Sequence, residues 1–417
     1  MNANTADLLK PEPPPAREQF PIADELQPRR RLLEGRKFVW LLSPAWDHVW
    51  TRQNHFTTRF ARLGAEILYI ENPSSWFSVL KKKTWRDLPV GRRPVRQVEP
   101  GLHVMRPSFS LPGIRQSDGV AKLNGRFIAG QAKAWMRSRG WTDYVAWCRV
   151  PHSHFTLEHL RPNVTAYDIT DDYELFENRL ERRARVRERE QRLLAASDVV
   201  FLASQDLQRR KALADVENFW IPNGAEYDLF AAASEPGGVH PLIRQLRQPV
   251  IGYVGLTTHW MDFDLLEKLA ARWPGQILML GPIAPQVEKR ARSIPGLAWA
   301  GFVPQKQLAP YLRGFAVCIM PHLSNELVRM SNPLKIWEYL ATGKAIVSID
   351  IPALSAVREF VDLAQDHDHF IRLVAQRLRT GPPQPRAAAQ LAARNYSWDA
   401  IFQRLLEKLE PHFRSKD

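Results

Sequence analysis

Lys335 and Glu338 are the two residues whose types and spacing most directly suggest chemistry in this chain. They lie three positions apart in "SNPLKIWEYLATGK" (331–344), so on a helix they would share one side, roughly 4.5 Å apart along the axis. A lysine in the first helical turn, near the unpaired amides at the positive end, favours phosphate binding. A carboxylate one turn later could accept hydrogen bonds from both hydroxyls of a ribose. An ordinary surface ion pair is the alternative interpretation.

The same stretch has the residues that begin and end a short helix. Asn332 is a strong N-cap candidate, Pro333 suits the first helical position, and Gly343 suits the left-handed residue after a helix. Apolar residues recur at spacings of three and four and predict the side of the helix that faces the core: Leu334, Trp337, Leu340 and Ala341.

A second segment could bind phosphate through its backbone. In "GYVGLTTHWMDFD" (252–264) a strand ends at Gly255, and a loop then joins it to a helix. Gly255 permits close approach of a ligand, and backbone N–H groups here, including that of Thr257, could bind a diphosphate opposite Lys335. The alternative is a structural turn with Asp262 as a helix cap, and we favour capping over metal binding for "DFD".

Candidates for a general base lie in the N-terminal half. "YDITDDY" places Asp168, Asp171 and Asp172 just after an apolar strand. Clustered carboxylates raise one another's pKa, and a base with a pKa near neutrality can activate a hydroxyl group. Asp171 and Asp172 could instead cap the following helix. His152 and His154 follow another strand and could serve as base or as packing residues.

The bulk composition indicates a globular protein with anionic partners. The 417 residues exceed one ordinary core, and the net charge of +14 favours nucleic acid, acidic lipid headgroups or phosphorylated substrates. Basic and aromatic residues concentrate in 76–96, which indicates either an interfacial membrane contact or a plain surface loop. Cys148 and Cys318 each lie in an apolar run, which indicates buried thiols rather than a disulfide or a metal site.

Short apolar runs alternate with helical patterns in two series, which predicts two doubly wound α/β domains with parallel sheets. Between the series we expect a linker at 234–249, because "SEPGGVHPLIRQLRQP" is rich in proline and glycine. No G-x-G-x-x-G follows a strand, "ATGKA" lacks the features of a P-loop, and G-x-S-x-G is missing. Dinucleotide-dependent reductases, P-loop enzymes and α/β-hydrolases therefore lose support.

Several stretches resemble the GT-B glycosyltransferases, specifically the family-4-like bacterial transferases of exopolysaccharide and teichuronic-acid assembly. The C-terminal matches are "IPNGAEYDLF", "IGYVGLTTHWMDFDLLEKLA", "GFVPQKQLAPYLRGFAVCIMPH", "NPLKIWEYLATGKAIVSIDIP" and "NYSWDAIFQRLLEKL". They occur in the family's order and cover most of residues 218–410. The N-terminal half matches more loosely, through "WTRQNHFTTRFARLG" and "YDITDDYELF".

The resemblance implies two Rossmann-like domains facing a cleft, with the sugar nucleotide held mainly by the second, and a C-terminal helix that crosses back to the first. The expected divisions are a disordered leader (1–35), an acceptor-binding domain (36–230), a nucleotide-sugar-binding domain (246–385) and the returning helix segment (386–417).

The resemblance also implies residue roles. Glu338 is similar to the family's ribose-binding glutamate, and Lys335 to its phosphate-binding lysine. Met330 stands where many retaining members carry a second glutamate, so retention or inversion stays open. The expected donor-binding residues are Glu338, Lys335, Gly255, Thr257, Asn332 and Leu334. The expected catalytic residues are Asp171, Asp172 and His154, and the expected acceptor-side residues are Arg52, Gln53 and His55.

We therefore expect a cytoplasmic glycosyltransferase, peripherally associated with the inner face of the plasma membrane. It would move a hexose-type sugar from a nucleoside-diphosphate sugar to a lipid-linked or polysaccharide acceptor, without a metal or other cofactor. One alternative is a sugar-nucleotide 2-epimerase of the same fold, which needs no lipid acceptor. A basic nucleic-acid-binding protein is less favoured, because the basic residues are scattered and no recognition motif stands out.

Overall fold

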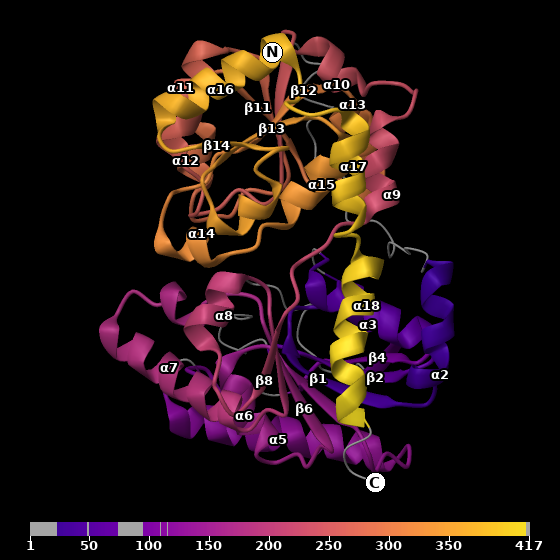
Figure 1. The fold of residues 1–417 in the computed structure, drawn as a ribbon. Helices are drawn as coiled ribbons and strands as arrows, with labels where there is room; N and C mark the ends of the chain where they lie inside the picture. Colours follow the sequence, from indigo (N-terminus) through magenta and orange to yellow (C-terminus); the bar gives the residue numbers. More distant parts are fainter. Residues whose placement is uncertain (1–22, 48–49, 74–94, 109, 115, 414–417) are drawn as a thin grey trace. The chain divides into compact units, whose positions relative to one another are not determined.

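The computed structural model describes residues 23–47, 50–73, 95–108, 110–114 and 116–413. They form two compact α/β units (Figure 1), which confirms the fold class expected from the sequence. The C-terminal unit contains Asn223–Ala400, and the N-terminal unit contains Pro21–Pro222 together with Ile401–Asp417.

The described part of the N-terminal unit contains an eight-stranded sheet in the order β3-β4-β2-β1-β5-β6-β7-β8. All neighbouring strands pair in parallel except β3 and β4. The central strands are almost entirely buried, as continuous apolar runs predict for a parallel sheet covered on both faces. The strands are β1 (Lys37–Ser43), β2 (Glu66–Glu71), β3 (Val95–Glu99), β4 (Leu102–Met105), β5 (Val145–Cys148), β6 (Val164–Ile169), β7 (Val199–Leu202) and β8 (Glu217–Trp220).

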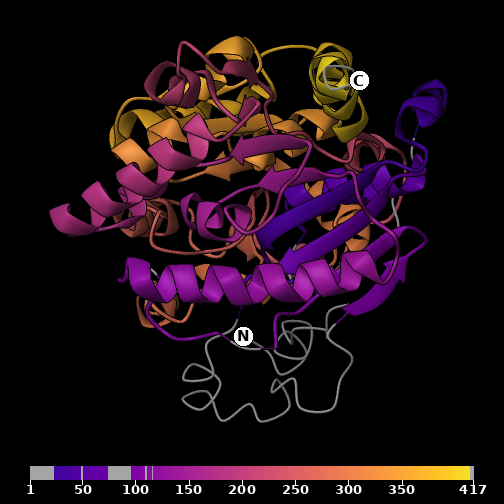
Figure 2. The same ribbon diagram turned by 90° about the horizontal axis from the view of Figure 1, so that it is seen from below.

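The helices of this unit begin at local capping residues. Asn54 accepts a hydrogen bond from the Thr51 amide at the start of α3, and Ser117 and Ser204 cap α5 and α8. Figure 2 shows α5 along its full length. The helical segments are η1 (Asp24–Arg29), α2 (Arg30–Leu33), α3 (Arg52–Arg62), α5 (Asp118–Arg137), η3 (Pro151–Ser153), α6 (His154–Leu157), η4 (Tyr173–Phe176), α7 (Leu180–Ala195) and α8 (Gln205–Lys211).

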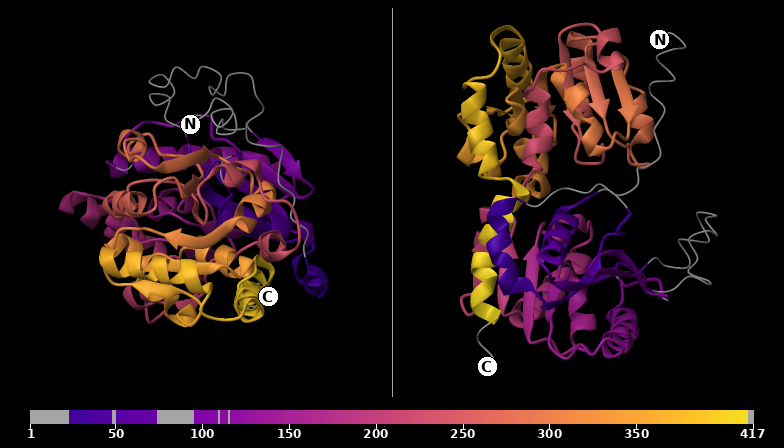
Figure 3. Two further views of the ribbon diagram at one scale, coloured as in Figure 1. Left: turned by 90° about the horizontal axis from the view of Figure 1, so that it is seen from above. Right: turned by 90° about the vertical axis from the view of Figure 1, so that its right-hand side faces the viewer.

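The last helix of the chain, α18 (Trp398–Leu409), packs on the N-terminal unit, as expected. The Phe402 ring lies 4.8 Å from the Phe60 ring and 6.1 Å from the Phe56 ring, both on α3. Arg29 reaches Glu410, in η8 (Glu410–Phe413), at 3.2 Å. In Figure 3 this helix, in yellow, runs beside the indigo N-terminal segment. The first and last described segments of the chain therefore stabilise each other.

The C-terminal unit contains a parallel six-stranded sheet in the order β11-β10-β9-β12-β13-β14. Its strands are β9 (Val250–Val254), β10 (Ile277–Leu280), β11 (Leu297–Gly301), β12 (Phe315–Met320), β13 (Ala345–Ile349) and β14 (Asp362–Ala364). Its helical segments are α9 (Tyr227–Ala231), η5 (Ala232–Ser234), α10 (Pro241–Gln245), α11 (Phe263–Arg272), α12 (Glu288–Arg292), η6 (Gln305–Gln307), α13 (Ala309–Arg313), α14 (Glu326–Met330), α15 (Leu334–Thr342), η7 (Pro352–Val357), α16 (His367–Thr380) and α17 (Arg386–Arg394).

Two expectations about segments without regular structure were wrong in part. The expected linker at 234–249 belongs to the C-terminal unit, because Leu242 and Ile243 of α10 are buried in its core. Arg313 also donates to carbonyl oxygens of this segment and of the residues before it. Within the expected leader, residues 24–33 are helical, because Leu26 and Leu33 supply buried apolar side chains. Residues 1–22 lie outside the described residues.

Each sheet has a switch point, where the chain reverses the direction in which strands are added. This point lies between β1 and β5 in the N-terminal unit and between β9 and β12 in the C-terminal unit. Open α/β sheets bind ligands beside the carboxyl ends of the strands at such points. Separately, no helix among the described residues is both long enough and apolar enough to cross a membrane.

Candidate functional site

Helix α15 (Leu334–Thr342) follows β12 and the short α14, and it contains both Lys335 and Glu338. It begins at Leu334, after Pro333 in an extended conformation, and ends before Gly343, which has the left-handed φ of +64°. Its ending is therefore the expected one. Its start lies one residue later than expected, because Pro333 stays outside the helix.

Asn332 is not the N-cap that we expected. Its side-chain oxygen accepts from the Asn223 amide at 3.3 Å and from Trp337 Nε1 at 3.4 Å. Its carbonyl oxygen accepts from Asn223 Nδ2 at 2.7 Å. Asn332 therefore binds the segment before α15 to the start of the C-terminal unit, and the first-turn amides keep their donors. In the described structure, the amides of Leu334 and Lys335 donate to no residue.

Lys335 and Glu338 form an ion pair with 2.7 Å between Nζ and Oε2. The side chains are 24% and 4% exposed, so this pair is not the surface pair of the alternative interpretation. A buried carboxylate with a single lysine partner keeps capacity to accept further hydrogen bonds. The polar side of α15 is thus largely shielded from solvent at Glu338 and partly open at Lys335.

Gly255, at the carboxyl end of β9, lies against this pair. Its φ is +153°, and a Cβ placed there would lie 3.4 Å from Lys335 Cε and 2.7 Å from Tyr253 Oη. Gly281 packs equally closely, because its Cβ would lie 2.1 Å from the Gly255 carbonyl oxygen. Neither position leaves room for a side chain, so the backbone itself forms the surface beside Lys335.

The amides of the β9–α11 loop divide into used and unused donors. Gly255 N–H donates to the Leu280 carbonyl at 2.8 Å, and Thr257 N–H donates to the Pro282 carbonyl at 2.9 Å. Thr257 is also buried. These two amides hold the loop to the β10–α12 segment and do not serve as the expected phosphate donors. The Leu256 amide donates to no described residue, and Leu256 is partly exposed, so it is the available donor that the sequence analysis missed.

Two further side chains of this region were not expected. Tyr253 is buried, its hydroxyl donates to the Leu256 carbonyl, and burial, followed by the nearby Glu338 carboxylate, raises its pKa. The His322 ring lies 6.1 Å from the Tyr253 ring, and burial lowers the pKa of this imidazole to about 4. A neutral phenol thus lies near Glu338, and a neutral histidine lies beside that phenol. Only the apolar strand pattern marked Tyr253, and nothing marked His322.

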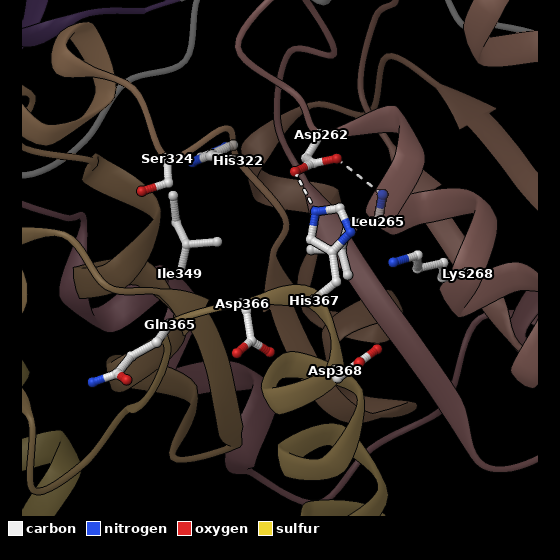
Figure 4. Close-up of a pocket in the computed structure, with 10 residues that line it drawn as sticks. All are labelled: Asp262, Leu265, Lys268, His322, Ser324, Ile349, Gln365, Asp366, His367 and Asp368. Atoms are coloured by element: carbon white, nitrogen blue, oxygen red, sulfur yellow. Dashed lines mark hydrogen bonds and ion pairs between the residues drawn. The ribbon is translucent and has the colours of Figure 1, made fainter.

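A separate hollow of about 420 Å³ lies near the ends of β12, β13 and β14 (Figure 4). Asp262 caps α11 by accepting from the Leu265 amide, which agrees with the expected capping role, and its other oxygen lies 2.8 Å from His367 Nε2. These groups already bind one another, and neither Lys335 nor Glu338 contributes to the wall. The lining residues are Asp262, Leu265, Lys268, His322, Ser324, Ile349, Gln365, Asp366, His367 and Asp368.

In the N-terminal unit, the expected acceptor-side residues are structural. Arg52 Nε binds both oxygens of Asp168 at 3.0 and 3.1 Å, and Arg52 Nη1 donates to the Pro222 carbonyl at 2.8 Å. Gln53 bridges Trp40 and Asp168 through its two amide atoms. His55 is 2% exposed and packs against the Trp50 ring. All three lie on α3, whose side chains are buried at this end because α3 covers the sheet.

The three expected catalytic residues differ in their surroundings. Asp172 is fully buried and lies 2.8 Å from Lys211 Nζ and 3.0 Å from Arg210 Nε, so its charge is already neutralised. His154 is buried against Phe155, and burial lowers its pKa. Neither geometry fits a base that must reach a substrate, and both expectations are corrected.

Asp171 is more accessible than Asp172 and His154. It is half-buried, and Oδ2 accepts one hydrogen bond, from Thr170 Oγ1 at 2.8 Å. It lies in the loop after β6, at the carboxyl edge of the sheet. The expected membrane-contacting segment 76–96 lies almost entirely outside the described residues, which resume at 95.

Comparisons with known proteins relate the C-terminal unit to glycosyltransferases. Residues 248–379 match a family described as Glycosyl transferases group 1. Over 239 residues, 54% of this chain, the sequence is 24% identical to TuaH of Bacillus subtilis (strain 168), which is named for a glycosyltransferase role in teichuronic acid biosynthesis. The match spans 60% of TuaH.

Solved structures extend the similarity to both units. Sucrose-phosphate synthase from Thermosynechococcus elongatus is 14% identical, with a TM-score of 0.66 over 92% of this chain and 100% of that chain. The UDP-forming trehalose-phosphate synthase from Burkholderia vietnamiensis is 14% identical, with a TM-score of 0.63 over 90% and 96%. Anabaena HepE, solved with UDP-glucose, is 14% identical, with a TM-score of 0.59 over 90% and 99%. These structures confirm the expected GT-B fold.

Proposed function

We propose that this chain, a GT-B fold whose residues 248–379 form a group 1 glycosyl transferase domain, transfers a sugar from a nucleoside-diphosphate sugar to a hydroxyl acceptor. The observation that carries the proposal is the buried Lys335–Glu338 pair on the first turns of α15, directly beside the backbone of Gly255. A lysine, a helix N-terminus and a glycine without room for a side chain together favour a diphosphate.

In this proposal, the residues divide the donor between them. Lys335 Nζ, with the free amides of Leu256 and Leu334, binds the diphosphate and stabilises the negative charge that develops on the leaving group. Glu338 accepts hydrogen bonds from the ribose hydroxyls. The buried Tyr253 near it stays protonated and adds no second negative charge. The UDP-forming synthase and the UDP-glucose complex of HepE support a UDP-sugar as donor.

The acceptor is proposed to bind the N-terminal unit. Asp171 is the candidate for the base that takes the proton of the acceptor hydroxyl, because it is the accessible carboxylate of its cluster. The name of TuaH supports a surface-polysaccharide role, with a lipid-linked or growing glycan as acceptor. No metal ion is required, since Lys335 and backbone amides supply the positive charge.

A described surface supports the proposed association with anionic membranes. Leu123 and Phe127, on one side of α5, are 54% and 41% exposed. Exposed basic residues flank them on the same helix: Lys122, Arg126 and Arg137. The acidic residue of α5, Asp118, is already bound to Arg189. Among the described residues, none of these three cations forms an ion pair, and exposed apolar side chains among such cations favour anionic lipid headgroups.

Vesicle flotation tests this surface. With vesicles of phosphatidylglycerol and phosphatidylcholine, changing both Leu123 and Phe127 to Glu should reduce the bound fraction several-fold. Leu391→Glu is the matched control, because Leu391 is 66% exposed on α17 of the other unit. Undiminished binding of the double variant would contradict the role of α5.

The function itself is tested with candidate donors. In a thermal-shift panel of UDP-, GDP- and ADP-sugars, we expect UDP-sugars to raise the melting temperature most. Incubation with the stabilising donor alone separates the alternatives, because a 2-epimerase would convert it to an epimer and a transferase would not. A salt-dependent shift of DNA at nanomolar protein, without stabilisation by any sugar nucleotide, would contradict the proposal in favour of nucleic-acid binding.

A further inference from the structure

Arg149 lies at a position that the proposed function has not yet used. It follows β5 directly, at the carboxyl edge of the N-terminal sheet, and β5 borders the switch point beside β1. Ligands of open α/β sheets bind at this place. The side chain is half-buried, so it is neither a core residue nor a freely solvated surface cation.

The guanidinium of Arg149 has no hydrogen-bond or ion-pair partner within the part of the chain that the structure describes. Five other arginines of this unit that are at least partly buried bind a carboxylate: Arg52 with Asp168, Arg62 with Glu99, Arg106 with Glu71, Arg189 with Asp118 and Arg210 with Asp172. Others donate to backbone carbonyl oxygens: Arg36 to Leu32, Arg59 to His55 and Arg183 to Glu177. A half-buried guanidinium whose N–H groups lack acceptors loses hydrogen bonds to water, and an anion that binds there would restore them.

The groups around Arg149 keep it charged without satisfying it. Its guanidinium lies 6.0 Å from the Tyr173 ring centre, too far for a hydrogen bond. Burial would lower its pKa, but Tyr173, Asp171, Tyr69 and Asp168 outweigh burial, and the pKa is raised. Asp168 cannot turn toward it, because Arg52 and Gln53 already hold both carboxylate oxygens. The site therefore presents a permanent positive charge with open donors.

We propose that Arg149 binds an oxyanion, a phosphate or a carboxylate, carried by the acceptor close to the hydroxyl that Asp171 activates. This inference rests on the proposed function. A guanidinium offers two parallel N–H donors to such a group. Asp171, on the loop after the neighbouring strand β6, offers an acceptor for the reacting hydroxyl, and Thr170 and Tyr173 add hydroxyl groups suited to a sugar.

The charge of Arg149 restricts the acceptors that would bind well to those that carry an anionic group. A neutral sugar would leave Arg149 unsatisfied, whereas an acceptor with a uronate carboxylate or a phosphate would neutralise it. The donor's diphosphate does not need Arg149, because Lys335 and the amides of Leu256 and Leu334 already offer it donors in the C-terminal unit. The two oxyanion sites are therefore assigned to different substrates.

Saturation-transfer NMR on the full chain tests the proposal, with UDP at saturation so that the donor site is filled. The probes are methyl β-D-glucuronide, glucose 1-phosphate and neutral methyl β-D-glucoside, the first two separating carboxylate from phosphate. The unmodified chain should bind at least one charged probe about 10- to 100-fold more tightly than the neutral one. Arg149→Gln should lose this preference, and Arg149→Lys should keep part of it. Arg139→Gln, a control cation that stacks on Trp135, should keep all of it.

The outcomes are separable from the function itself. Equal binding of charged and neutral probes by the unmodified chain, or no binding of either charged probe, would overturn the proposal without any variant. An unchanged preference in Arg149→Gln would overturn it as well. UDP affinity, measured on the same samples, reports on the donor site. Arg149→Gln should leave the affinity for UDP unchanged. If the unmodified chain failed to bind UDP, that result would count against the proposed function instead.

Discussion

Replacing Glu338 with Gln should weaken the binding of UDP, in part through the hydroxyls of its ribose. The substitution keeps the size of the side chain and removes its charge, at a position that is 4% exposed. It also removes the ion pair with Lys335, so the change in UDP affinity by itself mixes two effects. Comparing UDP with 2′,3′-dideoxy-UDP separates them, because the second ligand lacks only the hydroxyls assigned to Glu338.

The magnitude follows from the two hydrogen bonds. A hydrogen bond to a charged group contributes about 1.5–3 kcal/mol and one between neutral groups about 0.5–1.5 kcal/mol. Two hydroxyls that exchange a carboxylate for an amide should therefore lose about 2 kcal/mol together, or about 30-fold in Kd. The loss of the ion pair affects both ligands equally, so it cancels in the double cycle.

Isothermal titration calorimetry with both ligands and both proteins measures the coupling. We expect removal of the hydroxyls to weaken binding to the unmodified chain about 30-fold more than binding to Glu338→Gln. Glu288→Gln is the control, because Glu288 also pairs with a cation on its own helix but is 48% exposed. Equal losses for the dideoxy ligand in both proteins would refute the ribose assignment.

Three further predictions concern the surroundings of this site. Gly255→Ala should weaken UDP binding and lower the melting temperature, because the new Cβ would lie 2.7 Å from Tyr253 Oη, whereas Gly238→Ala should change neither, since its Cβ would meet nothing within 4 Å. Burial lowers the pKa of His322 to about 4 in the folded chain, whereas the pKa in the unfolded chain is near 6.5. Between these pH values the unfolded chain binds a proton that the folded chain does not. The free energy of unfolding should therefore fall by roughly 3 kcal/mol as the pH falls from 6.5 to 4. Thermal unfolding from pH 7 to pH 4 should show a shallower decline for His322→Phe, and parallel curves would contradict the assignment. EDTA should leave transferase activity unchanged, because Lys335 and backbone amides supply the positive charge, and loss of activity restored by Mg²⁺ would show that a metal is needed.

Much of the fold could be predicted from the sequence. Strands that are buried on both faces of a parallel sheet are continuous apolar runs, so such runs and the glycines that follow them mark the strands directly. Glycine at the end of a strand, and Gly343 with its left-handed backbone conformation after α15, are local features that the residue type alone can indicate. The segment 234–249 was misjudged because proline and glycine mark a turn without saying whether its apolar residues are buried. Leu242 and Ile243 settle that only through contacts with distant strands.

The candidate site was predictable where a residue's role depends on its own helix and not where it depends on remote partners. Lys335 and Glu338 share a face by helical geometry, and the structure brings them together. Asp172 looked like a free carboxylate because Lys211, far along the chain, is invisible in a local pattern. Arg149 was missed for the converse reason, since an absent partner leaves no sequence signal.

A crystal structure of the full chain with UDP tests the central claim most directly. The account predicts the ribose hydroxyls within hydrogen-bond distance of Glu338, and the diphosphate beside Lys335 Nζ and the amides of Leu256 and Leu334. UDP bound in the hollow between Asp262 and Asp366, or with its ribose turned away from Glu338, would contradict it.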